Sequence, residues 1–157
     1  MYNTILLAAA LQKWKRYSAH ALAARDMAAA LARGTSRCLH VVTAYEYEPI
    51  QGIEAPVDTI NQLRGQQRHQ TDTLMQHTIN AFIAPLQDEG LKVETILRAG
   101  SPQEVIVDVV NSIGADVLVI GSHSKRGLFD IALSGIAQQV IKHPPCQVVL
   151  VYPARRA

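Results

Sequence analysis

Four short runs of apolar and β-branched residues constrain the fold of this chain more than any other feature of its sequence. They cover residues 4–9, 38–44, 116–121 and 147–151. Each is too short for a stable helix and nearly continuously apolar, which is typical of strands covered on both faces in a parallel sheet. A fifth run, residues 91–97, alternates apolar and polar side chains as an edge strand does.

Helical patterns lie between these runs, and we expect helices over residues 18–33, about 58–89, 102–113 and 135–142. Ser101-Pro102-Gln103-Glu104 has the pattern of a capping box with proline at the first helical position, and Gly114 that of a left-handed stop. The second helix is predicted to bury one broad face, made of Leu74, Ile79, Phe82, Ile83 and Leu86.

The alternation of strands and helices predicts an α/β fold with right-handed crossovers. We expect an open, doubly wound, five-stranded parallel sheet with helices on both faces, in one domain over residues 1–157. In such sheets a ligand sits beyond the carboxyl ends of the strands, where the strand order reverses. The loops that follow the first, second and fourth strands are therefore the candidate site.

Composition and charge exclude several classes of protein. The net charge is only +2, which argues against a nucleic-acid binder. No run approaches the roughly 18 apolar residues of a membrane helix, and the first residues lack the pattern of a signal peptide. We therefore expect a cytoplasmic protein that contacts neither nucleic acid nor membrane. Cys38 and Cys146 are too few for a disulfide framework or a zinc site, and are interpreted as reduced, buried thiols.

The most informative segment follows the fourth strand, over residues 115–130. A buried strand gives way to small and basic residues, and a helix follows. Small residues let the backbone approach a phosphate, and the amides of a helix N-terminus donate to it. Lys125 and Arg126 would add positive charge, although an exposed pair of this kind is also ordinary surface. On these grounds the segment is a candidate anion site.

Several segments resemble the universal stress protein family. They are residues 5–7, 39–42, 99–102, 114–124, 132–141 and 145–151. The resemblance covers nearly the whole chain, and it implies the strand order 3-2-1-4-5 of an adenine nucleotide alpha hydrolase-like sheet. It also implies a homodimer joined antiparallel through the last strand, Gln147–Val151, whose uncovered edge would otherwise invite pairing. ATP or another adenine nucleotide, with or without Mg²⁺, is the ligand that it implies.

The nucleotide-binding branch of that family resembles Gly-x2-Gly-x9-Gly-Ser/Thr in this loop, and the present chain departs from that pattern. In order, the positions fall on Gly121, Ser124, Ser134 and Gly135, so that only the first matches. The branch also has an acidic residue after the first strand, where this chain has Ala10. The altered loop keeps small residues and main-chain amides, so a phosphate site is still sterically conceivable.

The resemblance implies two groups of site residues. Those expected around the phosphates are Gly121, His123, Ser124, Ser134, Gly135 and Ile136, and those expected near the base and the strand ends are Ala8, Ala10, Val41 and Ile120. Two functions stay open at this point: a regulatory module that binds an adenine nucleotide, and a nucleotide-free dimeric interaction protein that acts through protein partners.

A third reading, slow ATP hydrolysis assisted by Asp130, has little support. The chain has no Gly-x-Ser-x-Gly elbow, no Walker loop and no recognisable Ser/His/Asp constellation, and we expect no enzyme. His40 lies on a predicted buried strand and is interpreted as a core histidine with satisfied hydrogen bonds. His69 and His77 are eight residues apart on one helix and lack partners at metal-ligand spacing, so we expect no metal site.

Overall fold

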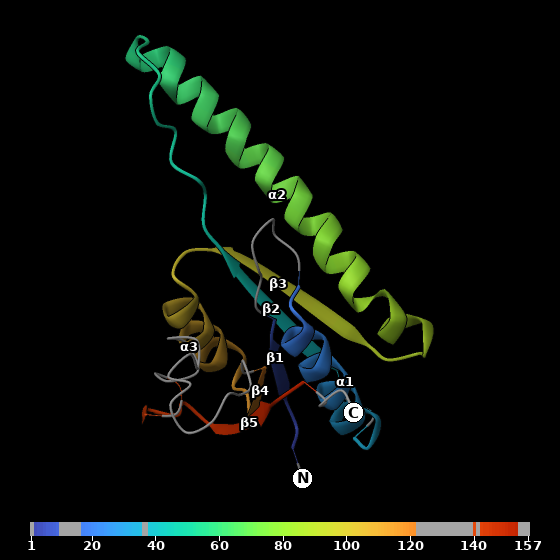
Figure 1. The fold of residues 1–157 in the computed structure, drawn as a ribbon. Helices are drawn as coiled ribbons and strands as arrows, with labels where there is room; N and C mark the ends of the chain where they lie inside the picture. Colours follow the sequence, from blue (N-terminus) through green and yellow to red (C-terminus); the bar gives the residue numbers. More distant parts are fainter. Residues whose placement is uncertain (1, 10–16, 36–37, 122–139, 141, 154–157) are drawn as a thin grey trace.

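The computed structural model describes residues 2–9, 17–35, 38–121, 140, 142–153 of the 157. Within these ranges the strands and helices alternate as the sequence predicts (Figure 1). The elements are β1 (Ile5–Ala8), α1 (Ala19–Arg33), β2 (Leu39–Tyr45), α2 (Val57–Asp88), β3 (Val93–Ala99), α3 (Pro102–Ile113), β4 (Val117–Gly121) and β5 (Gln147–Val151). The helix expected over residues 135–142 lies almost wholly outside the described residues.

The five strands form one parallel sheet in the order β3-β2-β1-β4-β5. The predicted fold class and strand order are thereby confirmed. β3 and β5 are the two edge strands, as expected, although β3 begins and ends two residues later than the predicted run. From β1 the chain adds β2 and β3 on one side, and it then crosses to add β4 and β5 on the other side. The switch point of the sheet therefore lies at the carboxyl ends of β1 and β4.

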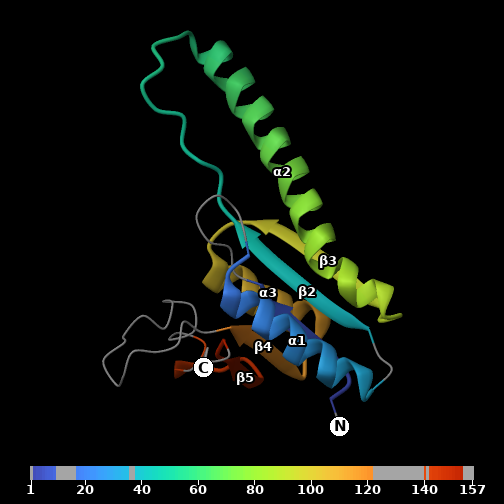
Figure 2. The same ribbon diagram turned by 45° about the vertical axis from the view of Figure 1, so that its right-hand side comes forward.

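Side chains of alternate strand residues build a separate core on each face of the sheet. Ile5 and Leu7 point to the face that α1 and α2 cover, whereas Leu6 and Ala8 point to the face that α3 covers. Figures 1 and 2 show α1 and α2 on one side of the sheet with α3 on the other. Burial on both faces explains why the strands read as continuous apolar runs in the sequence.

The two short helices end and begin at recognisable signals. The hydroxyl of Ser18 accepts a hydrogen bond from the amide of Ala21 at 3.1 Å, which caps the N-terminus of α1. Gly114 ends α3 in the left-handed conformation, with φ 63° and ψ 47°, as predicted. The predicted capping box does not form: Ser101 precedes Pro102 at the start of α3, but its side chain makes no capping hydrogen bond.

The long helix α2 is packed against the sheet only along its second half. Its buried residues are Thr71, Met75, Ile79, Phe82, Ile83 and Leu86. The predicted apolar face is therefore confirmed except at Leu74, which is 49% exposed. Both ribbon views show the first half of α2 extending beyond the sheet, next to the segment that follows β2 (Figures 1 and 2). Within the described part of the chain, no helix is both long and apolar enough to cross a bilayer.

Candidate functional site

The carboxyl ends of β1 and β4 bring three of the predicted site residues together. Ala8 ends β1 and pairs in register with Ile120, and Gly121 follows as the last residue of β4. The side chains of Ala8 and Ile120 are buried in the core beneath α3. We call this part of the molecule, with Ala8, Ile120, Gly121 and the first turn of α1, the β1/β4 edge.

Other predicted residues lie elsewhere. Val41 pairs with Leu7 in the sheet and is fully buried in the core beneath α1 and α2. Its side chain is thus part of the core rather than of an exposed surface. The remaining predicted site residues lie outside the described residues: Ala10, His123, Ser124, Ser134, Gly135 and Ile136.

Gly121 lies against the main chain of α1. A Cβ atom at this position would be 2.4 Å from the carbonyl oxygen of His20 and 2.7 Å from its carbonyl carbon. No side chain can be accommodated at such distances unless the helix or the strand moves. Glycine therefore allows the first turn of α1 to pack directly on the end of β4, beside the switch point of the sheet.

A tyrosine covers the neighbouring ends of β1 and β2. The Tyr17 hydroxyl lies 3.0 Å from Oγ1 of Thr43, and the Thr43 hydroxyl donates to the carbonyl oxygen of Ala9 at 3.3 Å. Because the single hydroxyl proton of Thr43 goes to Ala9, Tyr17 donates to Thr43. The Tyr17 ring stacks on Phe82 of α2, with 4.0 Å between ring centroids. Burial raises the pKa of Tyr17 to about 12, so the hydroxyl stays protonated at neutral pH.

Sequence reasoning did not find this Tyr17–Thr43 contact. The available signals were a threonine within a mostly apolar strand and a tyrosine immediately before the residue that caps α1. Each is common by itself, and only the fold places the two 3.0 Å apart.

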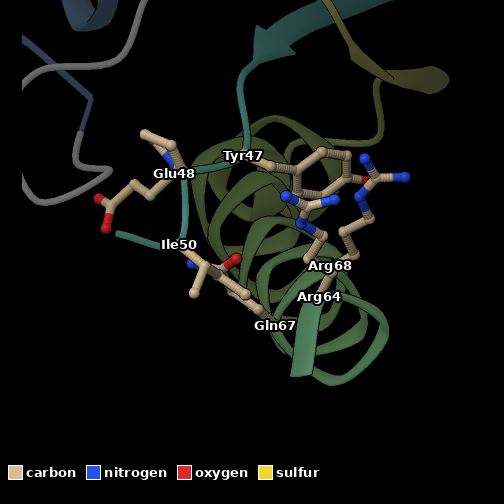
Figure 3. A pocket seen from close by; sticks show the side chains of 7 residues that line it. Tyr47, Glu48, Ile50, Arg64, Gln67 and Arg68 are labelled. Carbon is tan, nitrogen blue, oxygen red and sulfur yellow. The ribbon is translucent and has the colours of Figure 1, made fainter. Parts of the chain in front are cut away.

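A pocket of about 250 Å³ lies between the segment after β2 and the first half of α2 (Figure 3). Its lining residues are Tyr47, Glu48, Pro49, Ile50, Arg64, Gln67 and Arg68. Figure 3 shows Tyr47 and the two arginines gathered on one side, with Glu48 and Ile50 on the other. The Arg68 guanidinium carbon lies 5.1 Å from the centre of the Tyr47 ring, which is a cation–π contact.

One carboxylate holds the tyrosine wall of this pocket in place. The hydroxyls of Tyr45 and Tyr47 donate to the same oxygen of Asp72, at 2.6 and 2.7 Å. These two hydrogen bonds hold the pKa of Asp72 below its ordinary value, while burial and the Asp72 hydrogen bond raise the pKa of Tyr45. The pocket is lined by two guanidinium groups and the Glu48 carboxylate, and the Asp72 carboxylate lies next to its Tyr47 side, so the charges balance.

Taken together, the strand order and the helices on both faces define the chain as a doubly wound α/β domain, a class in which ligands bind at the switch point of the sheet. The family model that matches residues 1–152 is described as the universal stress protein family. Because the match spans nearly the whole chain, this protein belongs to that family.

The relatives agree with this assignment. The chain is 38% identical over 66 residues to universal stress protein MJ0577 of Methanocaldococcus jannaschii, a match that covers 42% of this chain and 41% of the relative. A solved structure of MJ0577 superposes with a TM-score of 0.74, covering 99% of both chains at 22% identity. The curated sequence matches thus span less than half of these relatives, whereas the fold is shared over the full length.

Two further structures of the family contain nucleotides. An Arabidopsis thaliana family protein with AMP bound covers 97% of this chain and 92% of its own, with a TM-score of 0.63 at 16% identity. The Archaeoglobus fulgidus universal stress protein in complex with dAMP covers 96% and 98%, with a TM-score of 0.61 at 22% identity. Adenine nucleotides therefore bind to proteins that share this fold.

Proposed function

We propose that this chain is a small cytoplasmic regulatory module that binds an adenine nucleotide, ATP or a related one, at the β1/β4 edge, without turning it over. The observation that carries the proposal is the meeting of Ala8, Gly121 and the first turn of α1 at the switch point of the sheet. The complexes of family members with AMP and dAMP support the choice of ligand.

The phosphates are expected to bind to main-chain amides in the segment after β4. Gly121 ends the strand at the start of this segment, and Ser124 and Ser134 are small enough to let the backbone approach an anion. His123 would donate a further hydrogen bond, and Mg²⁺, where present, would neutralise part of the phosphate charge. The first turn of α1 adds the partial positive charge of a helix N-terminus next to Gly121.

Binding is expected to be weaker than in members that keep the full pattern. Ala10 removes a carboxylate, and with it a charge-assisted hydrogen bond typically worth about 1.5–3 kcal/mol. A serine forced to adopt a positive φ costs on the order of 1 kcal/mol relative to glycine. Together these losses correspond to a dissociation constant that is roughly 10²–10³-fold higher.

A second candidate function is a nucleotide-free homodimer that acts through protein partners. Ala10 and the order Ser134-Gly135 favour it, because both depart from the pattern of the nucleotide-binding branch. β5 favours the dimer, because it is an edge strand that is apolar apart from Gln147. The side chains of Val148, Val149 and Leu150 are only partly buried in the single chain. Both functions allow the chain to form a homodimer, and they differ in whether the chain binds a nucleotide.

A variant that restores the acidic residue and the Gly-Ser pair of the family pattern, and keeps Ser124, tests the nucleotide site. The triple substitution Ala10→Asp, Ser134→Gly and Gly135→Ser is expected to bind ATP roughly 10²–10³-fold more tightly than the natural chain. The matched control carries Ala10→Asn in place of Ala10→Asp, which keeps the size of the side chain but not its charge. It should recover only the part of the gain that comes from the loop.

The outcomes separate the two functions. Weak binding by the natural chain and tight binding by the restored variant support a nucleotide module with an altered loop. Binding by neither protein at millimolar ATP contradicts the proposal, because the site would then be absent even with the acidic residue and the Gly-Ser pair in place. Far-ultraviolet circular dichroism of both variants checks that the fold is kept.

A further inference from the structure

The amino ends of β2 and β3 bring a thiol, an imidazole and a carboxylate together. His40 on β2 pairs in register with Glu94 on β3, and Nε2 of His40 lies 3.2 Å from a Glu94 carboxylate oxygen. Cys38 lies two residues before His40, so in an extended chain its side chain projects from the same face. The ligand atoms of Cys38, His40 and Glu94 all lie within 4.8 Å of one another.

This cluster corrects the interpretation of His40 as a satisfied core histidine. Nδ1 of His40 is buried and has no hydrogen-bond partner among the described residues, while Nε2 faces Glu94. Among the residues that the structure describes, the imidazole therefore has one polar contact, with a carboxylate whose side chain is 59% exposed. Burial of the ring is maintained by the core beneath α3, where Val42 and Ile96, the next residues on this face of β2 and β3, are packed.

The spacing of His40 and Glu94 matches the coordination sphere of a tetrahedral ion, and Cys38 lies near enough to complete it. Zinc binds imidazole nitrogen and carboxylate oxygen at about 2.0–2.2 Å, which puts two such ligands roughly 3.3 Å apart. A thiolate at about 2.3 Å from zinc would lie roughly 3.6 Å from the nitrogen. The observed distance between Nε2 and the Glu94 oxygen is 3.2 Å. The Cys38 sulfur lies within 4.8 Å of the other two ligand atoms, so a small rotation of its side chain would bring it to the distance of a bound thiolate.

We propose that Cys38, His40 and Glu94 form a Zn²⁺ site at the amino ends of β2 and β3, with water as the fourth ligand. A thiolate and an imidazole select a borderline-soft ion over Mg²⁺ or Ca²⁺, and three protein ligands leave one coordination position open. The exposure of Glu94 places that open position toward solvent. The site lies at the end of the sheet opposite the β1/β4 edge, so it is independent of nucleotide binding.

Zinc at this site would link the edge strand β3 to its neighbour β2. β3 is bound on one side only, by β2, and its first residues carry Glu94. An ion held jointly by residues of both strands binds the folded chain and not the unfolded one, and therefore raises the stability of the protein.

The test uses the full chain after chelation, with Zn²⁺ titrated by calorimetry and Co²⁺ by absorption spectroscopy. We expect one equivalent of metal per chain and, with Co²⁺, the charge-transfer absorption of a thiolate ligand. Cys38→Ser should abolish that absorption, and Glu94→Gln should weaken Zn²⁺ binding by more than the roughly 10–100-fold that loss of an outer-shell partner causes. Zn²⁺ should raise the melting temperature of the natural chain and not that of Cys38→Ser.

The chain offers matched controls. Cys146→Ser removes the other thiol, and His77→Gln removes a histidine outside the cluster; both variants should bind Zn²⁺ like the natural chain. Glu94 is exposed, so Glu94→Gln is expected to keep the fold. Failure of the natural chain to take up Zn²⁺ overturns the proposal. So does a thiolate–Co²⁺ absorption that survives Cys38→Ser or disappears in Cys146→Ser.

Discussion

Gly121, the last residue of β4, packs directly on the main chain of His20 in the first turn of α1. The space for a Cβ atom is already taken by the His20 carbonyl group, 2.4 Å away. This glycine therefore has a structural reason to be present that does not depend on a ligand. The same packing sets the distance between α1 and the segment that follows β4, and so determines the geometry of the β1/β4 edge.

Substitution of Gly121 by alanine should destabilise the protein. The added methyl group would overlap the His20 carbonyl, and overpacking of this kind typically costs about 1–3 kcal/mol. We expect chemical denaturation to show a lower free energy of unfolding by that amount.

Gly65 provides the matched control for this substitution. It lies inside α2, and a Cβ atom there would meet nothing within 4 Å. Gly65→Ala is expected to stabilise the protein by about 0.5–1 kcal/mol, because alanine loses less backbone entropy in a helix. Equal effects of the two substitutions would contradict the packing assigned to Gly121.

The Tyr17 hydroxyl should make stability depend on pH in the alkaline range. Its pKa is raised by burial from 10.0 to about 12 in the folded chain, so the folded state keeps a proton that the unfolded state loses. This contribution is fully present below pH 10 and is lost as the pH rises toward 12. The free energy of unfolding of the natural chain should fall across this interval.

Tyr17→Phe isolates that effect from those of other tyrosines. The ring can still stack on Phe82, but the hydrogen bond to Thr43 is lost, at a cost of about 0.5–1.5 kcal/mol at neutral pH. The difference between the two proteins should shrink as the pH rises above 10. A difference that does not change with pH would refute the assignment of a protonated, buried hydroxyl.

Asp72 should contribute to stability above its ordinary pKa and lose this contribution in acid. Hydrogen bonds from Tyr45 and Tyr47 lower its pKa below 3.8, so the folded state favours the carboxylate. The contribution is present above pH 3.8 and is lost as the pH falls through the lowered folded pKa. Asp72→Asn should be less stable than the natural chain at neutral pH, and the free energies of unfolding of the two proteins should become equal in acid.

Asp108→Asn, an exposed position on α3, is the control for Asp72→Asn and should have little effect. Thermal unfolding of the three proteins over a series of pH values measures these differences. If the difference in melting temperature between the natural chain and Asp72→Asn stays constant down to the lowest pH, the hydrogen bonds of the two tyrosines do not depend on the Asp72 charge.

Much of the fold could be predicted from the sequence because the signals are local. Continuous apolar runs mark strands buried on both faces, and Gly114 marks the end of α3. The expectation for Leu74 is wrong because this residue lies beside, rather than on, the stripe of Thr71 and Met75 that faces the sheet, and it is exposed.

The sites were less predictable because they depend on register. His40 and Glu94 are 54 positions apart, and only the pairing of β2 with β3 brings them together. Similarly, the contact of Tyr17 with Thr43 depends on how α1 packs on the sheet. Histidine or tyrosine alone in a strand or loop carries no such information, so the sequence suggested a core residue where the structure has a polar cluster.

The homodimer through Gln147–Val151 is a separate prediction. An apolar edge strand whose side chains are partly exposed is expected to pair with a second copy of itself. Analytical ultracentrifugation over a range of concentrations should give a dimer, and replacement of Val149 by proline should shift the mass toward the monomer by removing a ladder amide. A natural chain that sediments as a monomer throughout would contradict the dimer.

Calorimetric titration of ATP into the freshly purified natural chain, with Mg²⁺ and at moderate salt, tests the proposed nucleotide site most directly. The account predicts saturable binding of one nucleotide per chain, weaker than that of the restored variant, and a rise in melting temperature with ATP concentration. Absence of both heat and thermal stabilisation at millimolar ATP would contradict it, and would leave the chain as a nucleotide-free member of the family that acts through its partners.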